Sequence, residues 1–317
     1  MAEPDAAAES TVTVLVAGAA NMAIAIAKAI AAVISGSAAM LSESAHSVAD
    51  TVTEVLLLVA VRRGARPADD DHPLGHGREF YLWALLAAFA TFVAGAGISI
   101  LEGVEKLLHG ESPGDPWVAA IVLVVAFAIE SVSLLRALTQ VRASALRWDV
   151  RPRTFLRVTT DTAVKAVTFE DTAALVGLVL AGAGLALTHL TGSSMWDGIA
   201  SILIGVLLVV VAVSLTRANS SLLIGQTVPG DLRSALVAEL MAFPCVQDVP
   251  TLVTSVLGPE QVLVAARVRF SPDCTADDIA DVADQAEQRF LAHHPGVREV
   301  FLDPTPRLAH EERLSGS

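Results

Sequence analysis

Six apolar stretches run through the first two thirds of the chain, each of them long enough to cross a lipid bilayer. A membrane-spanning helix needs about 20 mostly apolar residues, and this criterion predicts six helices in the chain. They fall at residues 11–34, 38–61, 80–101, 117–138, 162–188 and 196–216. The pattern therefore predicts an α-helical membrane protein, with a transmembrane domain over residues 11–225 and an N-terminal tail over residues 1–10.

The pattern of apolar positions changes after residue 225. Apolar residues recur at helical spacing in two segments, and they alternate with polar residues in segments typical of half-buried strands. The predicted elements are a helix over 231–243, strands near 250–257 and 261–270, a helix over 275–292 and a strand near 297–302. This order, αββαβ, predicts a small α+β domain over residues 226–306, followed by a C-terminal tail over residues 307–317.

The composition supports a membrane protein and excludes several other classes. Hydrophobic residues make up 53% of the 317 residues and charged residues 17%, whereas a soluble domain carries roughly 25% charged residues. The net charge of −13 and the lack of a basic face disfavour nucleic-acid binding. Cys245 and Cys274 lie far apart and show no CxxC spacing, which argues against a disulfide framework and against a cysteine zinc site.

The arginines in the loops predict how the chain is oriented in the membrane, because short cytoplasmic loops carry the positive charge. Two loops are rich in arginine, whereas the segments HGESPGDP after the third helix and THLTGSS after the fifth contain no Lys or Arg. The arginines are Arg62, Arg63, Arg66 and Arg78 after the second helix, and Arg142, Arg147, Arg151, Arg153 and Arg157 after the fourth. Both termini are therefore expected in the cytoplasm. The first residues, MAEPDAAAES, lack the basic segment of a secretory signal, so no cleavage is expected.

The second predicted helix carries an unusual row of ionisable residues. Glu43, His46, Asp50 and Glu54 follow one another at steps of three, four and four residues, which places all four on one helical face. A carboxylate and an imidazole one turn apart can bind one divalent ion. An ionisable group inside the bilayer is costly and is a candidate for function. The alternative is that these groups hydrate near a helix end or hydrogen-bond to other helices, and it stays open above all for Glu43 and Glu54.

The fifth predicted helix contains two adjacent carboxylates, Glu170 and Asp171. Two neighbouring acids in lipid repel each other, and a bound cation or a shared proton relieves that repulsion. Adjacent residues point about 100° apart on a helix. One of the two is therefore expected to face the same cavity as His46 and Asp50, and the sequence does not say which one.

An acidic and histidine-rich segment, ADDDHPLGHGREF, follows the second helix. Within it, Asp69, His72 and His76 offer one carboxylate and two imidazoles over a few residues, a ligand set that suits a divalent metal ion completed by water. The alternative is a solvated turn that caps the third helix. Both interpretations stay open at this point.

These features together resemble the cation diffusion facilitator family of divalent-metal transporters. The resemblance rests on the HPLGHGR loop, the SESxHSxxDT pattern of the second helix, the six helices and the αββαβ tail, and it spans about residues 11–306. The loop sequence is specific, because an acidic run leading into HPxGHG after a membrane helix rarely arises by chance. The chain is most similar to the branch with a histidine and an aspartate in helix two and a Glu-Asp pair in helix five.

The resemblance implies a transport site formed by His46 and Asp50 together with the Glu170 and Asp171 region. Many relatives carry a histidine four residues before the aspartate of the fifth helix, where this chain has Val167. The site is therefore richer in oxygen ligands, which weakens a preference for zinc and favours manganese, iron or cobalt.

Two further metal sites of the family can be compared with this chain. The loop site of some members corresponds to Asp69, His72 and His76, and all three side chains are present. The binuclear site in the cytoplasmic domain of other members is not matched. Its positions fall on Pro250, Arg267, Phe301 and Asp303. We therefore expect no structural metal cluster in the tail.

The function implied by the resemblance is transport and not catalysis. It is the export of divalent cations (Zn²⁺, or Mn²⁺, Fe²⁺ or Co²⁺) from the cytoplasm by proton antiport and alternating access. The expected assembly is a homodimer in the plasma membrane, in contact through ferredoxin-like cytoplasmic tails. The metal ion is then a substrate, and no prosthetic cofactor is expected.

Two other classes of function compete with transport. An intramembrane zinc-dependent hydrolase would use His46 with acidic ligands, but it needs an open coordination position and a general base. The sequence has no HExxH and no second intramembrane histidine. A metal sensor that signals through its tail is the other alternative, and no kinase, phosphorelay or nucleic-acid element is visible.

Overall fold

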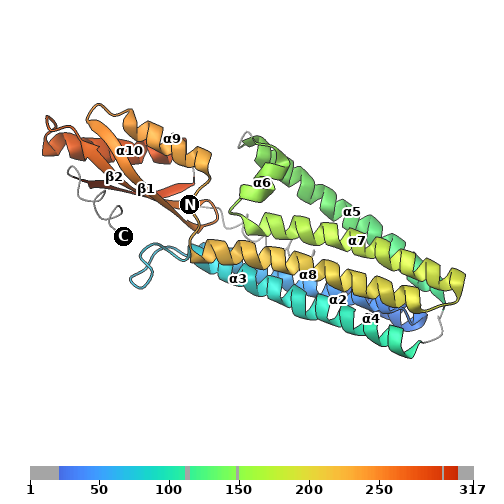
Figure 1. Ribbon diagram of the computed structural model, residues 1–317. Coiled ribbons are helices and arrows are strands. Elements are labelled where there is room, and N and C mark those ends of the chain that lie inside the picture. The colour runs from blue at the N-terminus through green and yellow to red at the C-terminus, as the bar shows by residue number, and fades with distance from the viewer. Residues whose placement is uncertain (1–20, 111–114, 148–149, 295, 306–317) are drawn as a thin grey trace, which may run out of the picture. The chain divides into compact units, whose positions relative to one another are not determined.

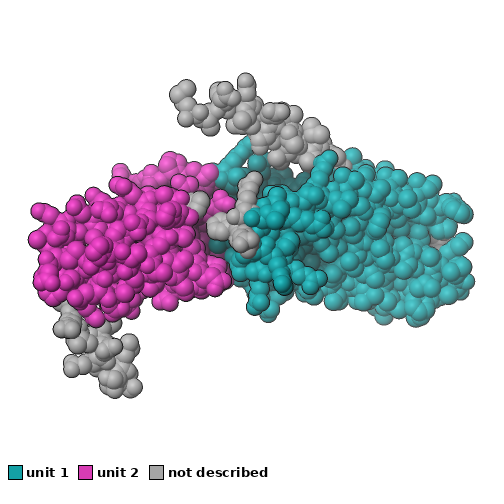
Figure 2. All heavy atoms as spheres, turned by 90° about the horizontal axis from the view of Figure 1, so that it is seen from above, with its two compact units in different colours: residues 1–63, 80–220 teal, residues 64–79, 221–317 magenta. Residues whose placement is uncertain are grey.

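The computed structural model describes residues 21–110, 115–147, 150–294 and 296–305. The two predicted tails and the first part of the predicted helix over 11–34 lie outside these residues. Figure 2 shows that the chain forms two compact units, one of residues 1–63 and 80–220 and the other of residues 64–79 and 221–317.

The described part of the first unit is helical (Figure 1). Its elements are a helix Asn21–Ser35, α2 (Ala38–Gly64), α3 (Gly77–Ala90), the π-helix η1 (Thr91–Gly97), α4 (Ile98–His109), α5 (Pro116–Arg147), α6 (Pro152–Val158), α7 (Thr162–Thr191) and α8 (Met195–Ile224). Five spans in the described residues are long and apolar enough to cross a membrane, one of them being the continuous run α3–η1–α4. The helix Asn21–Ser35 is a sixth, shorter apolar helix.

The outer surface of the helical unit is apolar. Val124 on α5 is 70% exposed, Leu101 on α4 is 70% exposed and Val210 on α8 is 57% exposed. Such side chains are normally buried in a soluble domain, whereas lipid tails solvate them well. The interior is built from small residues, with many alanines below 5% exposure. A small-residue interior lets helices approach closely, as is typical of helix packing in membranes.

Glycines bring α4 and α8 into close contact. A Cβ added at Gly103 would lie 2.6 Å from Ile202 Cγ1, and one added at Gly205 would lie 2.5 Å from Ile100 Cγ1. At Gly103 the α8 backbone also lies under 3.0 Å from the added Cβ, so a larger residue requires α8 to move, whereas at Gly205 it requires the Ile100 side chain to move. The α3–η1–α4 run and α8 are therefore held together by direct backbone approach.

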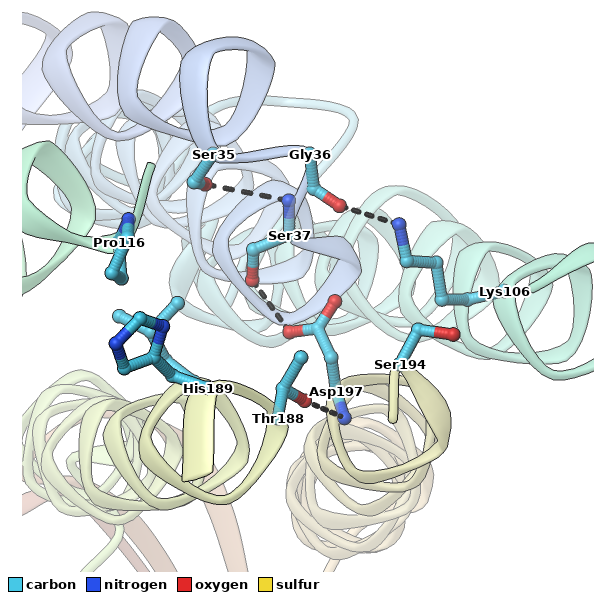
Figure 3. A pocket seen from close by; sticks show the side chains of 10 residues that line it. Ser35, Gly36, Ser37, Lys106, Pro116, Thr188, His189, Ser194 and Asp197 are labelled. Carbon is cyan, nitrogen blue, oxygen red and sulfur yellow. Dashed lines mark hydrogen bonds between the residues drawn. The ribbon is translucent and has the colours of Figure 1, made fainter. Parts of the chain in front are cut away.

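A buried aspartate of α8 fixes the start of α2 (Figure 3). The Asp197 carboxylate accepts a hydrogen bond from the Ser37 hydroxyl at 2.6 Å. It also accepts one from the Ala38 N–H at 2.6 Å. Lys106 of α4 donates to the Gly36 carbonyl at 2.6 Å in the same cluster. The first N–H groups of a helix lack partners within the helix. Here the Asp197 side chain, which belongs to a different helix, is the hydrogen-bond acceptor for the start of α2. These bonds position α2 against α4 and α8.

The tail unit confirms the predicted αββαβ order. Its elements are α9 (Gly230–Met241), β1 (Val246–Gly258), β2 (Gln261–Phe270), α10 (Ala276–His293) and β3 (Val297–Pro304). The sheet order is β1-β2-β3, with β1 and β2 antiparallel and β2 and β3 parallel. Alternate residues of β2, such as Val264 and Val268, are buried with Leu240 of α9 and Phe290 of α10. The core of the tail unit therefore lies between one face of the sheet and the two helices.

The two cysteines form a disulfide bond, which corrects the expectation from their spacing. Cys245 and Cys274 are 29 residues apart in sequence, but their Cα atoms lie 6.1 Å apart. The antiparallel pairing of Val246 with Phe270 brings the start of β1 beside the end of β2, and the Ser271 N–H donates to the Cys245 carbonyl at 2.9 Å. Strand register, which is not visible in the spacing, therefore brings the two residues together.

Candidate functional site

A cavity of about 80 Å³ lies inside the helical unit, between the helix Asn21–Ser35, α2, α5 and α7. Its volume exceeds the 10–15 Å³ or so that a single water molecule requires. Five carboxylates line it, namely Asp50, Glu54, Glu130, Glu170 and Asp171, together with Asn21, Ile24, Ser47, Leu57, Ile129, Ser133 and Val167. A cavity with so many acids in a largely apolar bundle suits a cation.

The four ionisable residues of α2 share one face but not one environment. Asp50 and Glu54 line the cavity, whereas Glu43 and His46 are buried at 0% and 1% exposure and do not line it. His46 Nδ1 lies 3.4 Å from Asp50 Oδ1. The imidazole is therefore next to a residue that lines the cavity, although it does not line the cavity itself. Glu54 is held by Asn21, whose side-chain amide donates to it at 2.6 Å.

Both acids of α7 line the cavity, although the sequence predicts that only one of them faces it. Asp171 accepts a hydrogen bond from Ser133 of α5 at 2.9 Å, and Glu170 accepts one from Thr91 of η1 at 3.4 Å. The two acids thus bond to different neighbouring elements, α5 and η1, although both line the cavity with side chains about 100° apart.

Several polar atoms around the cavity have no hydrogen-bond partner. They are Asp50 Oδ1, Glu54 Oε2 and both ring nitrogens of His46. Buried polar atoms in native proteins are almost always paired, and an unpaired charge in a low-dielectric interior is costly. The arrangement therefore calls for a cation, a proton or ordered water between these atoms.

Asp69, His72 and His76 form a second cluster in the loop after α2. Their ligand atoms lie within 4.8 Å of one another, and they are the one group of three such residues found in the described ranges. The Asp69 carboxylate lies 2.9 Å from His76 Nε2 and accepts a hydrogen bond from the His72 N–H at 2.7 Å. These bonds lower the pKa of Asp69 to about 2, and the contacts of His76 with Asp69 and Glu79 raise the pKa of His76. The cluster thus combines a structured turn with a compatible metal-ligand set.

The loop belongs to the same compact unit as the tail. The backbone at Gly77 lies so close to Leu257 and Gly258 of β1 that a Cβ would be 2.5 Å from the Leu257 carbonyl oxygen. Arg78 donates to the Ser255 hydroxyl at 3.2 Å. The ligand cluster is therefore carried on a segment that packs against the tail sheet, which the sequence does not reveal.

The tail positions compared with the family's binuclear site offer few ligands. Arg267 donates to the Asp303 carboxylate at 3.2 Å on an exposed part of the sheet. Pro250 and Phe301 contribute no ligand atom from their side chains. Elsewhere in the tail, His293 and His294 lie 3.4 Å and 3.1 Å from the Glu239 carboxylate.

Sequence reasoning missed two parts of the cavity. In the sequence, Glu130 of α5 is an isolated acid and Asn21 a secondary polar group, yet both line the cavity with the acids of α2 and α7. The sequence signal that could have identified Glu130 is a polar residue within an apolar helix. This signal does not show which side of α5 faces the interior of the helical unit.

Comparison with known proteins identifies the family. The family described as the cation efflux transmembrane domain matches residues 14–224. The proton-coupled zinc antiporter SLC30A9, mitochondrial, of Xenopus laevis is 32% identical over 243 residues, which is 77% of this chain and 44% of the relative. Metal tolerance protein C4 of Arabidopsis thaliana is 32% identical over 237 residues, covering 75% and 52% of the two chains. The chain thus spans about half the length of these curated relatives.

Two other similarities cover different lengths. The cation-efflux pump FieF of Escherichia coli O9:H4 is 26% identical over 284 residues, 88% of each chain. The solved nickel form of a MamM CTD variant covers 25% of this chain and all of that one, at 11% identity and a TM-score of 0.24, and this likeness is weak. With the family match over most of the chain and five apolar spans in the described residues, this is a multi-pass membrane protein that belongs to the cation efflux, or cation diffusion facilitator, family.

Proposed function

We propose that this protein is a secondary transporter that exports divalent metal cations by exchange for protons. The observation that carries the proposal is the cavity in which Asp50 of α2 and Glu170 and Asp171 of α7 converge. An ion that entered this buried cavity would lose water, and two lining oxygens without a hydrogen-bond partner, Asp50 Oδ1 and Glu54 Oε2, support binding of a cation there. The relatives named above, a proton-coupled zinc antiporter, a metal tolerance protein and a cation-efflux pump, support this chemistry.

The proposed binding site contains His46, Asp50, Glu170 and Asp171. Carboxylate oxygens and one imidazole nitrogen suit Zn²⁺, Mn²⁺, Fe²⁺ or Co²⁺, and the excess of oxygen moves the preference away from zinc. Protons compete with metal for the same atoms, because each ligand must be deprotonated to bind. Entry of protons from one side would then release the ion, which is the basis of antiport. The metal is the substrate, and the proposal includes no prosthetic group and no enzymatic step.

The loop cluster is proposed as a second, cytoplasmic metal site. Asp69, His72 and His76 would bind a divalent ion with water completing the coordination. The arginine-rich loops support a cytoplasmic position for this segment and for both termini. We further propose a transport domain over residues 11–225, a cytoplasmic domain over residues 226–306, terminal tails over 1–10 and 307–317, and a homodimer in the plasma membrane formed through the cytoplasmic domains.

The intramembrane hydrolase is not supported. The relatives named above are described by transport or metal tolerance and not by hydrolysis. A separate sensor function has no observation in its favour.

Metal-driven proton movement in proteoliposomes tests the proposal. Purified protein is reconstituted with a pH-sensitive dye inside the vesicles, and Zn²⁺, Mn²⁺, Fe²⁺ or Co²⁺ is added outside. We expect metal to accumulate while the lumen becomes alkaline, since protons leave as the ion enters. Vesicles without protein provide the baseline. Metal that fails to accumulate for every ion would contradict transport, and accumulation without a change in lumenal pH would contradict proton coupling.

A further inference from the structure

A fully buried lysine lies beside the cavity, and the mechanism above does not use it. Lys28 of the helix Asn21–Ser35 is 0% exposed. Its ammonium donates to the Ser47 hydroxyl at 2.8 Å and to the Glu43 carboxylate at 3.2 Å, and it lies 4.0 Å from a Glu130 carboxylate oxygen. A buried ammonium is costly unless acids compensate it. Lys28 is therefore a cation that depends on the two carboxylates between which it lies.

The two carboxylates differ in their relation to the cavity. Glu130 lines the cavity, with a side chain that is 15% exposed. Glu43 lies one helical turn before His46, is completely buried and does not line the cavity. Lys28 thus bridges one acid that a transported ion reaches and one acid that it does not reach.

Glu43 sits in a space created by a glycine of α7. A Cβ added at Gly177 would collide with Glu43 Oε1, and this oxygen has no hydrogen-bond partner. The carboxylate can therefore stay close to Lys28 only because residue 177 has no side chain. The position of the acid that holds Lys28 is fixed by packing and not by its own hydrogen bonds to α7.

A divalent cation in the cavity changes the balance between the two partners of Lys28. The ion attracts Glu130 and repels the ammonium, and such interactions are strong where water is scarce. Without the ion, the ammonium at 4.0 Å supplies positive charge to Glu130. Lys28 and the transported ion therefore compete for the same carboxylate.

We propose that Lys28 is a positioning residue that acts as a tethered competitor of the transported metal ion. In the empty site its ammonium lies between Glu43 and Glu130 and compensates both carboxylates. When a metal ion enters, the ammonium stays with Glu43 and loses its interaction with Glu130, and recovery of that interaction helps to displace the ion. The inference rests on the proposed transport function and deepens it.

Two substitutions with opposite expected effects test the role of Lys28. In Lys28→Met the competitor is lost, so the metal dissociation constant, measured in detergent by titration with Mn²⁺ or Co²⁺, falls by about tenfold, and the maximal transport rate in proteoliposomes falls because release is slower. In Gly177→Ala the Glu43 carboxylate is displaced while no charge changes. Lys28 then remains with Glu130, and the dissociation constant rises by about tenfold.

Matched controls separate this role from general damage to the bundle. Lys165→Met removes another buried lysine, which lies on α7 outside the cavity lining. Gly182→Ala adds a methyl group on α7 where nothing lies within 4 Å. Both are expected to keep the wild-type dissociation constant and rate.

The outcomes distinguish this inference from the proposed function. If the wild-type protein moves metal and Lys28→Met binds it with unchanged or lower affinity, Lys28 is not a competitor. If Lys28→Met does not fold, the charge-balanced pair Lys28→Met with Glu43→Gln replaces it, and the same tighter binding is required. Equal shifts in one direction for Lys28→Met and Gly177→Ala would also overturn the inference. A wild-type protein that moves no ion would instead overturn the transport function itself.

Discussion

At the scale of single residues, Val167 is the position at which ligand chemistry can be changed most directly. It lines the cavity four residues before Asp171, so Val167→His places an imidazole one helical turn from a proposed ligand. We expect zinc to gain about tenfold over manganese in apparent transport affinity, because nitrogen ligands favour zinc in an otherwise oxygen-rich site. Competition among zinc, manganese and cobalt in proteoliposomes measures the change. Val167→Gln adds polarity without an imidazole and serves as the control, and an unchanged rank order in Val167→His would refute the assignment.

Features of single residues can be predicted from the sequence where they depend on the geometry of one helix alone. The spacing of Glu43, His46, Asp50 and Glu54 predicts a common face of α2. On that face Asp50 and Glu54 line the cavity, whereas Glu43 and His46 are buried outside its lining. The ion pair of Glu43 with Lys28 is not predicted. Helical periodicity is a local property, whereas the partner of a side chain depends on how two helices are rotated against each other. The cavity members Asn21 and Glu130 escape prediction for the same reason.

At the scale of elements, the sequence predicts most helices and strands but fewer of their ends and irregularities. The tail elements lie within a few residues of the predicted ranges. The predicted helix over 80–101 is part of a continuous span Gly77–His109 that contains the π-helix η1, and the short helix α6 is not predicted. A hydropathy pattern shows which segments of the chain are apolar. It does not show whether the backbone within an apolar segment has the hydrogen bonds of an α-helix or of a π-helix.

Asp197 is predicted to stabilise the start of α2, although it belongs to α8. Asp197→Ala leaves the Ser37 hydroxyl and the Ala38 N–H without their acceptor in a buried setting. We expect the free energy of unfolding to fall by about 2–4 kcal/mol, as for a lost cap and lost bonds to a charged group. Unfolding in detergent, followed by circular dichroism, measures this loss.

The control for this substitution is an exposed cap. Asp115 accepts a hydrogen bond from the Trp117 N–H at 3.0 Å at the exposed start of α5. Asp115→Ala is expected to cost about 1 kcal/mol or less. An equal decrease in the free energy of unfolding for Asp197→Ala and Asp115→Ala would contradict the prediction that the contacts between α8 and α2 stabilise the protein more than an exposed cap does.

At the scale of the whole molecule, the chain forms two units whose boundaries cannot be predicted fully from the order of the elements along the sequence. The sequence predicts a boundary near residue 225, but residues 64–79 also group with the tail. The packing of Gly77 against Leu257 depends on contacts between segments far apart in sequence, as does the Arg78–Ser255 bond with its separation of 177 residues. Periodicity cannot reveal such contacts. The disulfide between Cys245 and Cys274 escapes prediction for a related reason, since strand register brings the two residues together.

The division into units predicts that loop binding and transport can be separated. His72 is exposed and contributes one nitrogen to the loop cluster. We expect His72→Ala to weaken metal binding at the loop by about 10- to 100-fold, while the transport rate stays within about twofold of wild type, since the cavity of the helical unit is untouched. Titration of the detergent-solubilised protein with Zn²⁺ measures binding, and proteoliposomes measure transport. His109→Ala, at an exposed histidine of α4, is the control, and a loss of transport equal to the loss of binding would contradict the separation.

We propose that acids of α2 and α7 jointly bind the transported ion in one cavity. The decisive measurement is metal-driven proton flux in proteoliposomes containing Asp50→Asn or Glu170→Gln, with Glu105→Gln at the exposed end of α4 as the control for a neutralised acid. We expect proton flux to be abolished in both cavity variants, at equal amounts of reconstituted protein, and to be retained in Glu105→Gln. Undiminished flux in Asp50→Asn and Glu170→Gln would contradict it.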